Sequence, residues 1–527
     1  MRFLIALIIA LPIVAYAMQR PTDTVPASHG FDVVEATLDD VRTAINNDRV
    51  TCRQLVQAYL DRISAYDKSG PTLHAVQTVN PRALDEADRL DSAFKARGPV
   101  GPLHCVPVLV KDQIDTAGIP TTHGFIGFKN FVPSRDATVV ARLKAAGAVV
   151  VAKATMGEFA SGYISSASGP IRNAYDPRRS ASGSSGGTGT GIAASLAAVG
   201  VGEDTGGSVR GPAAVNALVG LRPTLPLVSR HGMSPARPST DTIGPMARTV
   251  TDAAKLFDVM VGYDPHDPVT AQGVGHIPVS YASLLSADGL RAARIGVVTE
   301  PMNANTNVAA DDYAATRRIV NAAVLRMREL GAHVVDNVTI PNVIDRLNRV
   351  YDGNVFETEH AMDGYLRSHE NAPYKTLREI LLSGLVVPAR ARTLMDTIGR
   401  TTDGAPYAEL LRLQEDTRQA VFTLMADQQI DFLLYATFDH LPGIISDDVM
   451  TRTVVADTAG LGNNRRLSPV LGFPAITVPG GFVGDVPVGL ELMGRPFSEG
   501  ALFRLAYAFE QATRHRRPPH GSPPLTR

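Results

Sequence analysis

The chain carries almost no net charge, because 51 lysines and arginines stand against 52 aspartates and glutamates. An excess of positive charge is the usual mark of a protein that binds nucleic acid or an anionic membrane surface. The sequence therefore gives no reason to expect nucleic acid as a partner, and it favours a small-molecule substrate. At 527 residues with 44% hydrophobic residues, the chain is long enough to form one large α/β core.

Cysteine is scarce as well. Cys52 and Cys105 allow one disulfide in an oxidising compartment, and two cysteines cannot form a structural zinc site alone. Cys105 leads into the apolar run 106–110, which favours a small buried apolar residue over half of a disulfide. No H-E-x-x-H motif or other metal-ligand spacing occurs, so we expect neither a metal nor a cofactor.

One apolar run, at the N-terminus, has the form of a targeting signal. Arg2 precedes the run 3–15, and Ala15-Tyr16-Ala17 has the A-x-A form of a signal-peptidase site. The run is shorter than the roughly 20 residues that a membrane-spanning helix needs. We therefore predict a signal peptide over residues 1–17, cleaved after Ala17, and an exported protein, periplasmic or secreted. An uncleaved membrane anchor is the alternative, and only then would a membrane be a partner.

The rest of the chain divides into three parts. Residues 18–36 predict an extended lead-in, residues 37–518 one main domain, and the proline-rich residues 519–527 a disordered tail. Continuous apolar runs such as 148–152 are typical of strands that are covered on both faces. The fold class expected is α/β, with a large mixed, mainly parallel central sheet covered by helices on both faces.

The expected elements follow from hydrophobic periodicity. Helices are predicted at 37–46, 52–66, 82–96, 137–146, 188–198, 311–330 and 499–513. Strands are predicted at 106–110, 148–152, 199–202, 294–298, 333–335, 431–435, 475–478 and 489–493. Between 341 and 406 the pattern loosens into helices with charged and aromatic residues, which we expect to form an insertion that shapes a substrate pocket.

Two glycine-lined serines are the strongest indication of chemistry. Gly183-Ser184-Ser185-Gly186-Gly187 is followed by Asp204-Thr205-Gly206-Gly207-Ser208. Glycine permits turns that a Cβ would block, and such turns leave a hydroxyl and backbone N–H groups accessible. Acyl transfer requires a nucleophile and donors aimed at the developing oxyanion. Lys111 ends an apolar run, where burial can remove its charge and make it a base.

These segments resemble the amidase signature family of serine hydrolases. The similarity extends over 38–518, is most specific over 182–224, and continues through Asp241-Thr242-Ile243-Gly244-Pro245-Met246-Ala247-Arg248. It implies the amidase signature fold, with residues 37–518 as the catalytic domain. It also implies hydrolysis of a carboxylic amide to the acid plus ammonia or an amine, with no metal or cofactor.

The resemblance assigns roles to individual residues. Ser208 would be the nucleophile, and Ser184, which follows a cis peptide bond in this family, would relay its proton to a neutral Lys111. From the residues themselves, we expect Ser185 to hold its loop or to cap the helix that follows, and Arg210 to fix the Ser208 loop by hydrogen bonds instead of touching substrate. The backbone N–H groups implied as oxyanion donors are those of Thr205, Gly206, Gly207 and Ser208.

The sequence departs from the family pattern at two positions. Glu203 stands where many members have threonine, and Ser182 stands where a glycine usually precedes the serine pair. Neither change removes a proton-transfer group. The details of the loops and the tuning of the lysine are therefore open, whereas the reaction class is not.

Several alternatives remain at this point. The segment 183–187 also fits the G-x-S-x-G nucleophile elbow of α/β-hydrolase esterases, although loop residues precede it. A phosphate-binding module is disfavoured because no G-x-x-x-x-G-K-[ST] motif occurs. His123 and His231 have no neighbours that suggest catalysis. Within the family, exported peptide amidases are favoured over the amidase component of the glutaminyl-tRNA amidotransferase. Fatty acid amide hydrolases, and an esterase of the same mechanism, are the alternatives. The natural amide, the oligomeric state and any activity on esters stay open.

Overall fold

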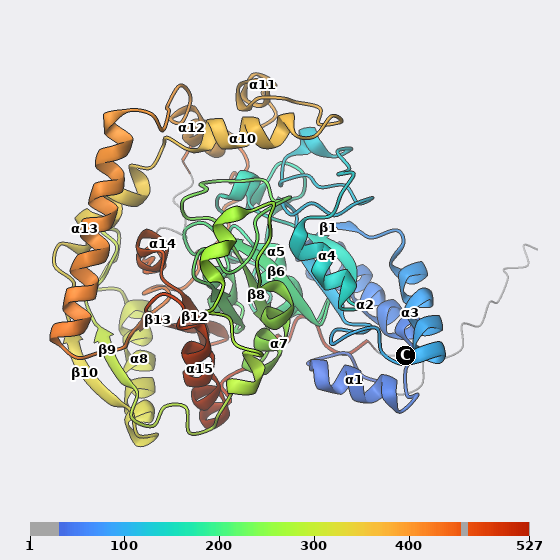
Figure 1. The fold of residues 1–527 in the computed structure, drawn as a ribbon, viewed down its shortest axis with the longest axis horizontal. Helices are drawn as coiled ribbons and strands as arrows, with labels where there is room; N and C mark the ends of the chain where they lie inside the picture. The colour runs from blue at the N-terminus through green and yellow to red at the C-terminus, as the bar shows by residue number, and fades with distance from the viewer. Residues whose placement is uncertain (1–30, 455–461, 526–527) are drawn as a thin grey trace, which may run out of the picture.

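The structure is a computed structural model that describes residues 31–454 and 462–525. The predicted signal peptide and most of the predicted lead-in lie outside the described residues. Within the described ranges, no helix combines the length and the apolar character needed to cross a bilayer. Helices surround a large central sheet (Figure 1).

Eleven strands of the described chain form this sheet, in the order β1-β3-β2-β6-β8-β7-β12-β13-β11-β9-β10. A separate pair, β4 (Ile164–Ser165) and β5 (Gly169–Pro170), forms a small ribbon. The strands of the large sheet are β1 (Val76–Val79), β2 (Pro107–Lys111), β3 (Val149–Ala154), β6 (Val199–Asp204), β7 (Val219–Arg222), β8 (Thr242–Ala247), β9 (Arg294–Val298), β10 (His333–Val338), β11 (Phe432–Ala436), β12 (Ala475–Val483) and β13 (Val486–Gly494).

The predicted α/β class with a large mixed sheet is confirmed. Parallel pairing joins β3, β2 and β6 at one side and β11, β9 and β10 at the other, whereas the strands between them pair antiparallel. Three strands of the large sheet, β1, β7 and β8, were not predicted, and neither was the small ribbon of β4 and β5. In β8 the sequence Thr-Ile-Gly-Pro-Met-Ala contains glycine and proline, which weaken a strand pattern.

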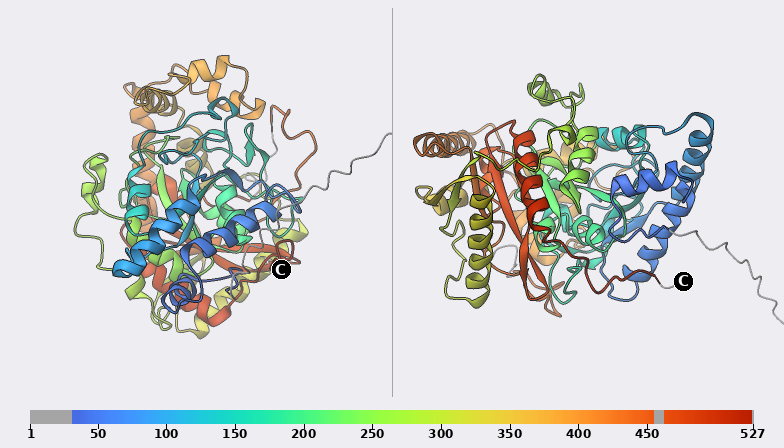
Figure 2. Two further views of the ribbon diagram at one scale, coloured as in Figure 1. Left: turned by 90° about the vertical axis from the view of Figure 1, so that its right-hand side faces the viewer. Right: turned by 90° about the horizontal axis from the view of Figure 1, so that it is seen from below.

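The helices cover both faces of the sheet (Figure 2). In Figure 1 α1 to α4 lie at one end of the sheet, α8 and α13 lie at the other, and α10 to α12 form a layer above it. The helices are α1 (Leu38–Asn46), α2 (Cys52–Tyr66), α3 (Ala83–Arg97), α4 (Thr138–Ala145), α5 (Gly186–Ala193), α6 (Arg210–Val215), α7 (Val250–Met260), α8 (Asp311–Glu329), α9 (Val343–Leu347), α10 (Thr358–Arg367), α11 (Leu377–Leu382), α12 (Pro388–Met395), α13 (Ala405–Asp427), α14 (Leu467–Leu471) and α15 (Glu499–Thr513).

Local sequence fixes several helix boundaries. Thr51 caps α2 by accepting a hydrogen bond from the Gln54 backbone, and the Gln54 side chain accepts one from the Thr51 backbone. This reciprocal capping box satisfies two N–H groups that would otherwise lack partners. The α15 helix covers the residues that its periodicity predicts, 499–513, and it packs against β12 and β13.

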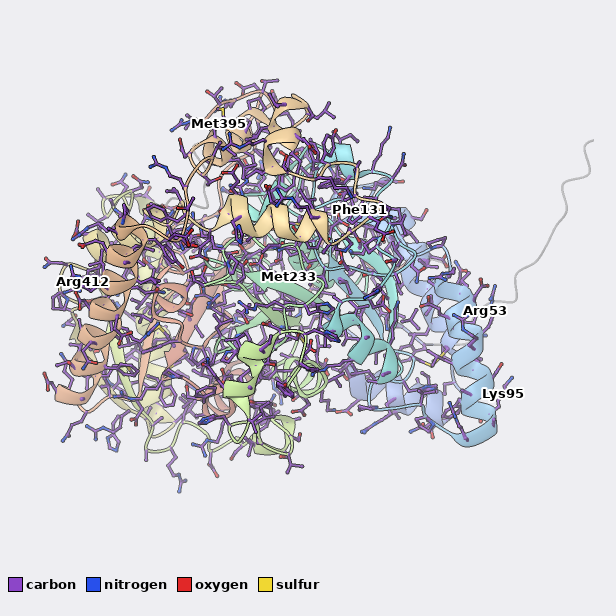
Figure 3. The ribbon with its side chains drawn as sticks, turned by 45° about the horizontal axis from the view of Figure 1, so that its top comes forward. Arg53, Lys95, Phe131, Met233, Met395 and Arg412 are labelled. Atoms are coloured by element: carbon purple, nitrogen blue, oxygen red, sulfur yellow. A yellow bond between two sulfur atoms is a disulfide. The ribbon has the colours of Figure 1, made fainter. Side chains whose placement is uncertain are left out.

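The layer formed by α10 to α12 has an apolar core of its own. Phe125, Phe128 and Phe131 from a loop after β2 pack against Tyr365 and its neighbours on these helices. Figure 3 shows Phe131 next to this layer, with Met395 at its outer edge. The segment predicted as a helical insertion, 341–406, thus contains short helices anchored on the main domain by aromatic packing.

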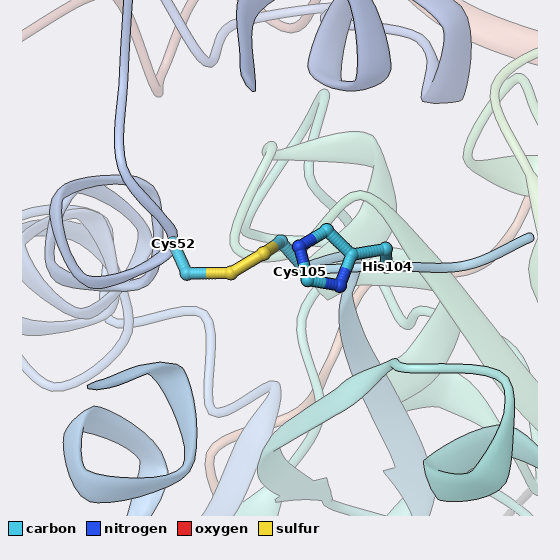
Figure 4. Close-up of side chains that lie close together, drawn as sticks. All are labelled: Cys52, His104 and Cys105. Atoms are coloured by element: carbon cyan, nitrogen blue, oxygen red, sulfur yellow. A yellow bond between two sulfur atoms is a disulfide. The ribbon is translucent and has the colours of Figure 1, made fainter. Parts of the chain in front are cut away.

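Cys52 and Cys105 form a disulfide, so the prediction that Cys105 is an unpaired apolar residue is wrong. Cys52 begins α2, Cys105 precedes β2, and their Cα atoms are 5.3 Å apart (Figure 4). Both residues are fully buried, as expected for apolar positions. The pairing could not be read from the sequence because tertiary packing alone brings the start of α2 beside the start of β2.

The described part of the predicted disordered tail, residues 519–525, is bound along α2 instead. The guanidinium of Arg62 donates to the Ser522 carbonyl at 2.8 Å and to the Pro523 carbonyl at 2.9 Å. The hydroxyl of Tyr66 donates to the Pro523 carbonyl at 2.7 Å. Side-chain donors from α2 therefore replace the regular secondary structure that a proline-rich segment cannot form.

Candidate active site

Lys111 lies at the end of β2 with a fully buried side chain. Its Nζ donates to Ser184 Oγ at 2.7 Å and to Glu203 Oε2 at 2.8 Å, with a longer contact to the Glu203 carbonyl at 3.3 Å. Burial lowers the pKa of Lys111 because a charged amine is poorly solvated there, and the Glu203 carboxylate acts in the opposite direction. The lysine predicted from the sequence therefore does contact the first serine of the predicted pair.

Ser184 lies in the loop that leads into α5, and the Gly183–Ser184 peptide bond is cis, as the family resemblance implies. A Cβ on Gly183 would collide with the Gly162 carbonyl, so only glycine fits there. The Ser184 carbonyl accepts a hydrogen bond from the Gly157 backbone at 2.9 Å. The serine hydroxyl is fully buried and faces Lys111.

Ser208 lies in the turn between β6 and α6 and is 9% exposed, whereas Lys111 and Ser184 are fully buried. The two serine loops are joined by a hydrogen bond from the Ser185 backbone to the Ser208 carbonyl, at 3.3 Å. In the described part of the chain, the Ser208 hydroxyl forms no hydrogen bond, so none connects it to Ser184. Gly207 has φ +111°, a conformation that favours glycine.

The predicted oxyanion donors do not all remain available. The Gly207 N–H donates to Asp204 Oδ1 at 2.7 Å, so the prediction that it is a free donor is wrong. The N–H groups of Thr205, Gly206 and Ser208 have no hydrogen-bond acceptor among residues 31–454 and 462–525. Three backbone N–H groups around the Ser208 turn can therefore donate hydrogen bonds to an oxyanion that develops beside it.

A buried charge network holds this turn. Asp204 accepts hydrogen bonds from the backbones of Gly207 and Val209, and it pairs with Arg210 and Arg222. Arg210 also contacts Glu491 and donates to the Arg465 carbonyl at 2.9 Å. Burial alone would raise the pKa of Asp204, but the two guanidinium groups hold it below its usual range. Arg210 therefore contacts the loop and its supports, with no contact to the Ser208 hydroxyl.

Ser185 is engaged with the backbone of β6. Its hydroxyl donates to the Glu203 carbonyl at 3.1 Å and accepts from the Glu203 backbone at 3.3 Å, and it is fully buried. It makes no capping bond to α5. A nucleophile elbow needs an exposed serine after a strand, and no described strand directly precedes Gly183. Ser185 therefore does not meet the requirements for the nucleophile of an α/β-hydrolase esterase.

Two contributors to this region were not predicted. The phenol of Tyr351 packs so closely over Gly206 that a Cβ there would collide with it. The guanidinium groups of Arg237 and Arg466 each lie 4.6 Å from the centre of the Tyr351 ring. Arg465 donates to the Gly207 carbonyl at 2.9 Å and so braces the Ser208 turn. These residues come from distant segments without any motif, so no local signal could have identified them.

The two histidines considered from the sequence lie elsewhere. His123 is buried, with Nε2 3.2 Å from the Tyr365 hydroxyl, and His231 stacks on His266. One group of metal-ligating residue types occurs in the described chain: Cys52, His104 and Cys105. Both of its sulfur atoms belong to the disulfide, so they cannot bind a metal as thiolates.

Comparison with known proteins agrees with this geometry. The family model described as Amidase matches residues 54–503. The native peptide amidase from Stenotrophomonas maltophilia superimposes with a TM-score of 0.82 at 32% identity, covering 93% of this chain and 99% of that one. A protein named probable amidase from Arabidopsis thaliana is 32% identical, over 93% of each chain.

A third relative carries a different activity in its name. This protein of Moorella thermoacetica, a component of the glutamyl-tRNA(Gln) amidotransferase, is 34% identical, over 92% of this chain and 98% of its own. The family model and these relatives span nearly the whole described domain. This chain belongs to the amidase family and is an amidase.

Proposed function

We propose that the enzyme hydrolyses a carboxylic amide through an acyl-Ser208 intermediate, with Ser184 and Lys111 as the proton relay. The observation that carries this proposal is the 2.7 Å hydrogen bond between a buried lysine and a buried serine, beside a second serine turn with unpaired N–H groups. An amide resists hydrolysis because its nitrogen donates into the carbonyl and leaves poorly, so a nucleophile, a proton carrier and an oxyanion site are all needed.

The acylation step moves one proton along three groups. Ser208 Oγ bonds to the amide carbon while its proton passes to Ser184 Oγ, and the Ser184 proton passes to neutral Lys111. The carbonyl oxygen becomes an oxyanion, which the N–H groups of Thr205, Gly206 and Ser208 stabilise. When the C–N bond breaks, the proton returns through Ser184 to the leaving nitrogen. Water then hydrolyses the acyl-enzyme by the same relay. The Ser184 and Ser208 hydroxyls form no hydrogen bond with each other in this structure, so the proposal requires that binding of substrate brings them together.

For the substrate we propose small or peptide-type amides. Peptide amidase is the named activity of a structural neighbour that matches this chain over nearly its full length. A cavity of about 210 Å³ borders Gly162, whose carbonyl abuts the Ser184 loop, and Tyr163, Val387 and Arg390 line it as well. It offers an apolar wall and a cation, and it adjoins the Ser184 loop through Gly162. Transfer of ammonia within a tRNA-dependent complex is the second candidate, since one relative is named for it.

We also propose that the protein is exported and loses residues 1–17. The A-x-A site supports cleavage. The Cys52–Cys105 disulfide supports an oxidising compartment, where such bonds persist. N-terminal sequencing of the protein from a periplasmic or culture fraction tests both points, and an intact Met1 with two reduced thiols would contradict them.

The reaction is tested with purified protein and a panel of amides: a C-terminal peptide amide, an aliphatic amide, a fatty amide and glutamine. We expect release of ammonia, an acyl adduct on Ser208 by mass spectrometry, and loss of both in Ser208→Ala. Ser92→Ala, an exposed serine on α3, is the matched control and keeps full activity. Unchanged hydrolysis by Ser208→Ala would contradict the proposed nucleophile, and activity on glutamine alone would favour the second candidate.

A further inference from the structure

Glu203 is the group that distinguishes this site from the threonine-containing pattern of many family members. Its carboxylate is fully buried, with Oε2 2.8 Å from Lys111 Nζ and Oε1 2.5 Å from Thr205 Oγ1. The same Thr205 hydroxyl lies 2.8 Å from Oδ1 of Asp241, which is also fully buried. Lys111, Glu203, Thr205 and Asp241 therefore form one continuous buried chain of hydrogen bonds.

The geometry at Thr205 fixes the number of protons in this chain. A hydroxyl has one hydrogen to donate, so Thr205 can donate to only one of the two carboxyl groups that it contacts. The other short contact needs a proton on the second carboxyl group. Asp241 is the better site, because its Oδ2 is engaged by the Ala236 and Arg237 backbones and its Oδ1 can donate to Thr205. Burial, followed by the charge of Glu203, raises the pKa of Asp241 to about 7.

This assignment leaves one uncompensated carboxylate facing Lys111. The charged groups around the amine are Glu203 and Asp204 on β6 and Asp241 just before β8. Asp204 is paired with Arg210 and Arg222, and Asp241 holds its proton, so the charge of Glu203 dominates. A carboxylate in contact favours the protonated amine and makes it a stronger base, whereas burial alone favours the neutral form.

We propose that Glu203 is a positioning residue whose ionised carboxylate, supported by Thr205 and a protonated Asp241, sets the base strength of Lys111 and so the pH range in which the serines are activated. The inference rests on the proposed function, because it assumes that Lys111 accepts the serine proton. The Glu203 carboxylate lowers the fraction of neutral Lys111 at low pH, and so the activity there, but it makes the neutral amine a stronger base.

The test is the pH dependence of kcat/KM for amide hydrolysis. In the wild-type enzyme the rate rises with pH as Lys111 loses its proton. Glu203→Gln removes the charge but keeps a hydrogen-bonding side chain, so we expect this acid limb to move to lower pH by about 1–3 units, with a lower plateau rate. Glu203→Thr, which restores the residue common in the family, gives the same direction of shift if the glutamine variant does not fold.

The Asp241→Asn variant distinguishes the role of the Asp241 carboxyl group from that of Glu203. The amide resembles protonated Asp241, since it can donate to Thr205 and accept from the two backbone N–H groups. We expect its acid limb to stay at the wild-type pH, whatever its plateau rate. The matched control is Glu510→Gln, a half-buried glutamate outside the site whose pKa burial raises to about 7, and its whole profile stays unchanged.

The outcomes distinguish this inference from the proposed function. An acid limb that does not move in Glu203→Gln and Glu203→Thr overturns the role of Glu203, while loss of activity in Ser208→Ala still supports the reaction scheme. A limb that moves in Asp241→Asn as far as in Glu203→Gln overturns the assignment of the proton to Asp241. An active Ser208→Ala enzyme defeats the proposed function itself, whatever the pH profiles show.

Discussion

Removal of Lys111 should lower both the stability and the activity of the enzyme, and a second substitution should restore only the stability. In the wild-type protein the Lys111 amine and the Glu203 carboxylate are both fully buried and 2.8 Å apart. Lys111→Ala leaves the carboxylate buried without its counter-charge, which costs about 3–5 kcal/mol in comparable pairs. The double variant Lys111→Ala/Glu203→Gln removes that unpaired charge, so it should regain most of the lost stability.

Catalysis follows a different rule from stability. Both variants lack the proposed base, so both should lose about 10²–10⁴-fold in kcat/KM at neutral pH. Part of the activity should return at high pH, where hydroxide can take the serine proton. The double variant therefore regains stability and not activity, a combination that a purely structural lysine would not give.

The assays are urea unfolding at pH 7 and amide hydrolysis across pH on the same preparations. Lys144→Ala, which removes a partly exposed ion pair with Asp136, is the matched control and should change stability by about 1 kcal/mol or less without affecting turnover. The reasoning is refuted if Lys111→Ala is as stable as the wild type. It is refuted equally if the double variant hydrolyses amide at the wild-type rate.

Three further predictions concern regions outside the site. Cys52→Ser breaks the disulfide and should lower the free energy of unfolding by about 2–4 kcal/mol, measured by urea unfolding against the wild type with and without reductant; an equal stability would show that the bond does not form. Arg62→Ala removes the donors that hold the C-terminal segment, so proteolysis should trim that segment sooner than in Arg53→Ala, and equal trimming rates would contradict the docking. Burial opposes the charge on His369, but the hydrogen bond to Asp115 prevails and raises its pKa. The stability that protonated His369 contributes is complete below about pH 6.5 and is lost as the pH rises through the raised pKa. His369→Gln should therefore lower the free energy of unfolding, measured in urea, more at pH 6 than at pH 9. An equal loss at the two pH values would contradict the assignment.

The sequence alone determined the reaction class and most of the local structure. Helix boundaries such as those of α2 and α15 follow from capping residues and hydrophobic periodicity, which act within a few residues along the chain. The glycine-lined serine loops indicated a candidate site, because the tight turns that acyl transfer requires leave a local sequence pattern. The family resemblance then named Lys111, which the structure brings into contact with Ser184.

Only the tertiary structure decided which distant groups meet. The Cys52–Cys105 bond, the docking of the C-terminal segment on Arg62 and the packing of Tyr351 over Gly206 each join segments far apart in the chain. The occupied Gly207 N–H likewise depends on where Asp204 points after the sheet has formed. Hydrophobic periodicity reports which face of an element is buried, but it carries no information on its neighbour. The burial of Lys111 was predicted from the sequence, but its contact with Glu203, and the link from Glu203 through Thr205 to Asp241, were not, because they depend on the pairing of β6 with β8.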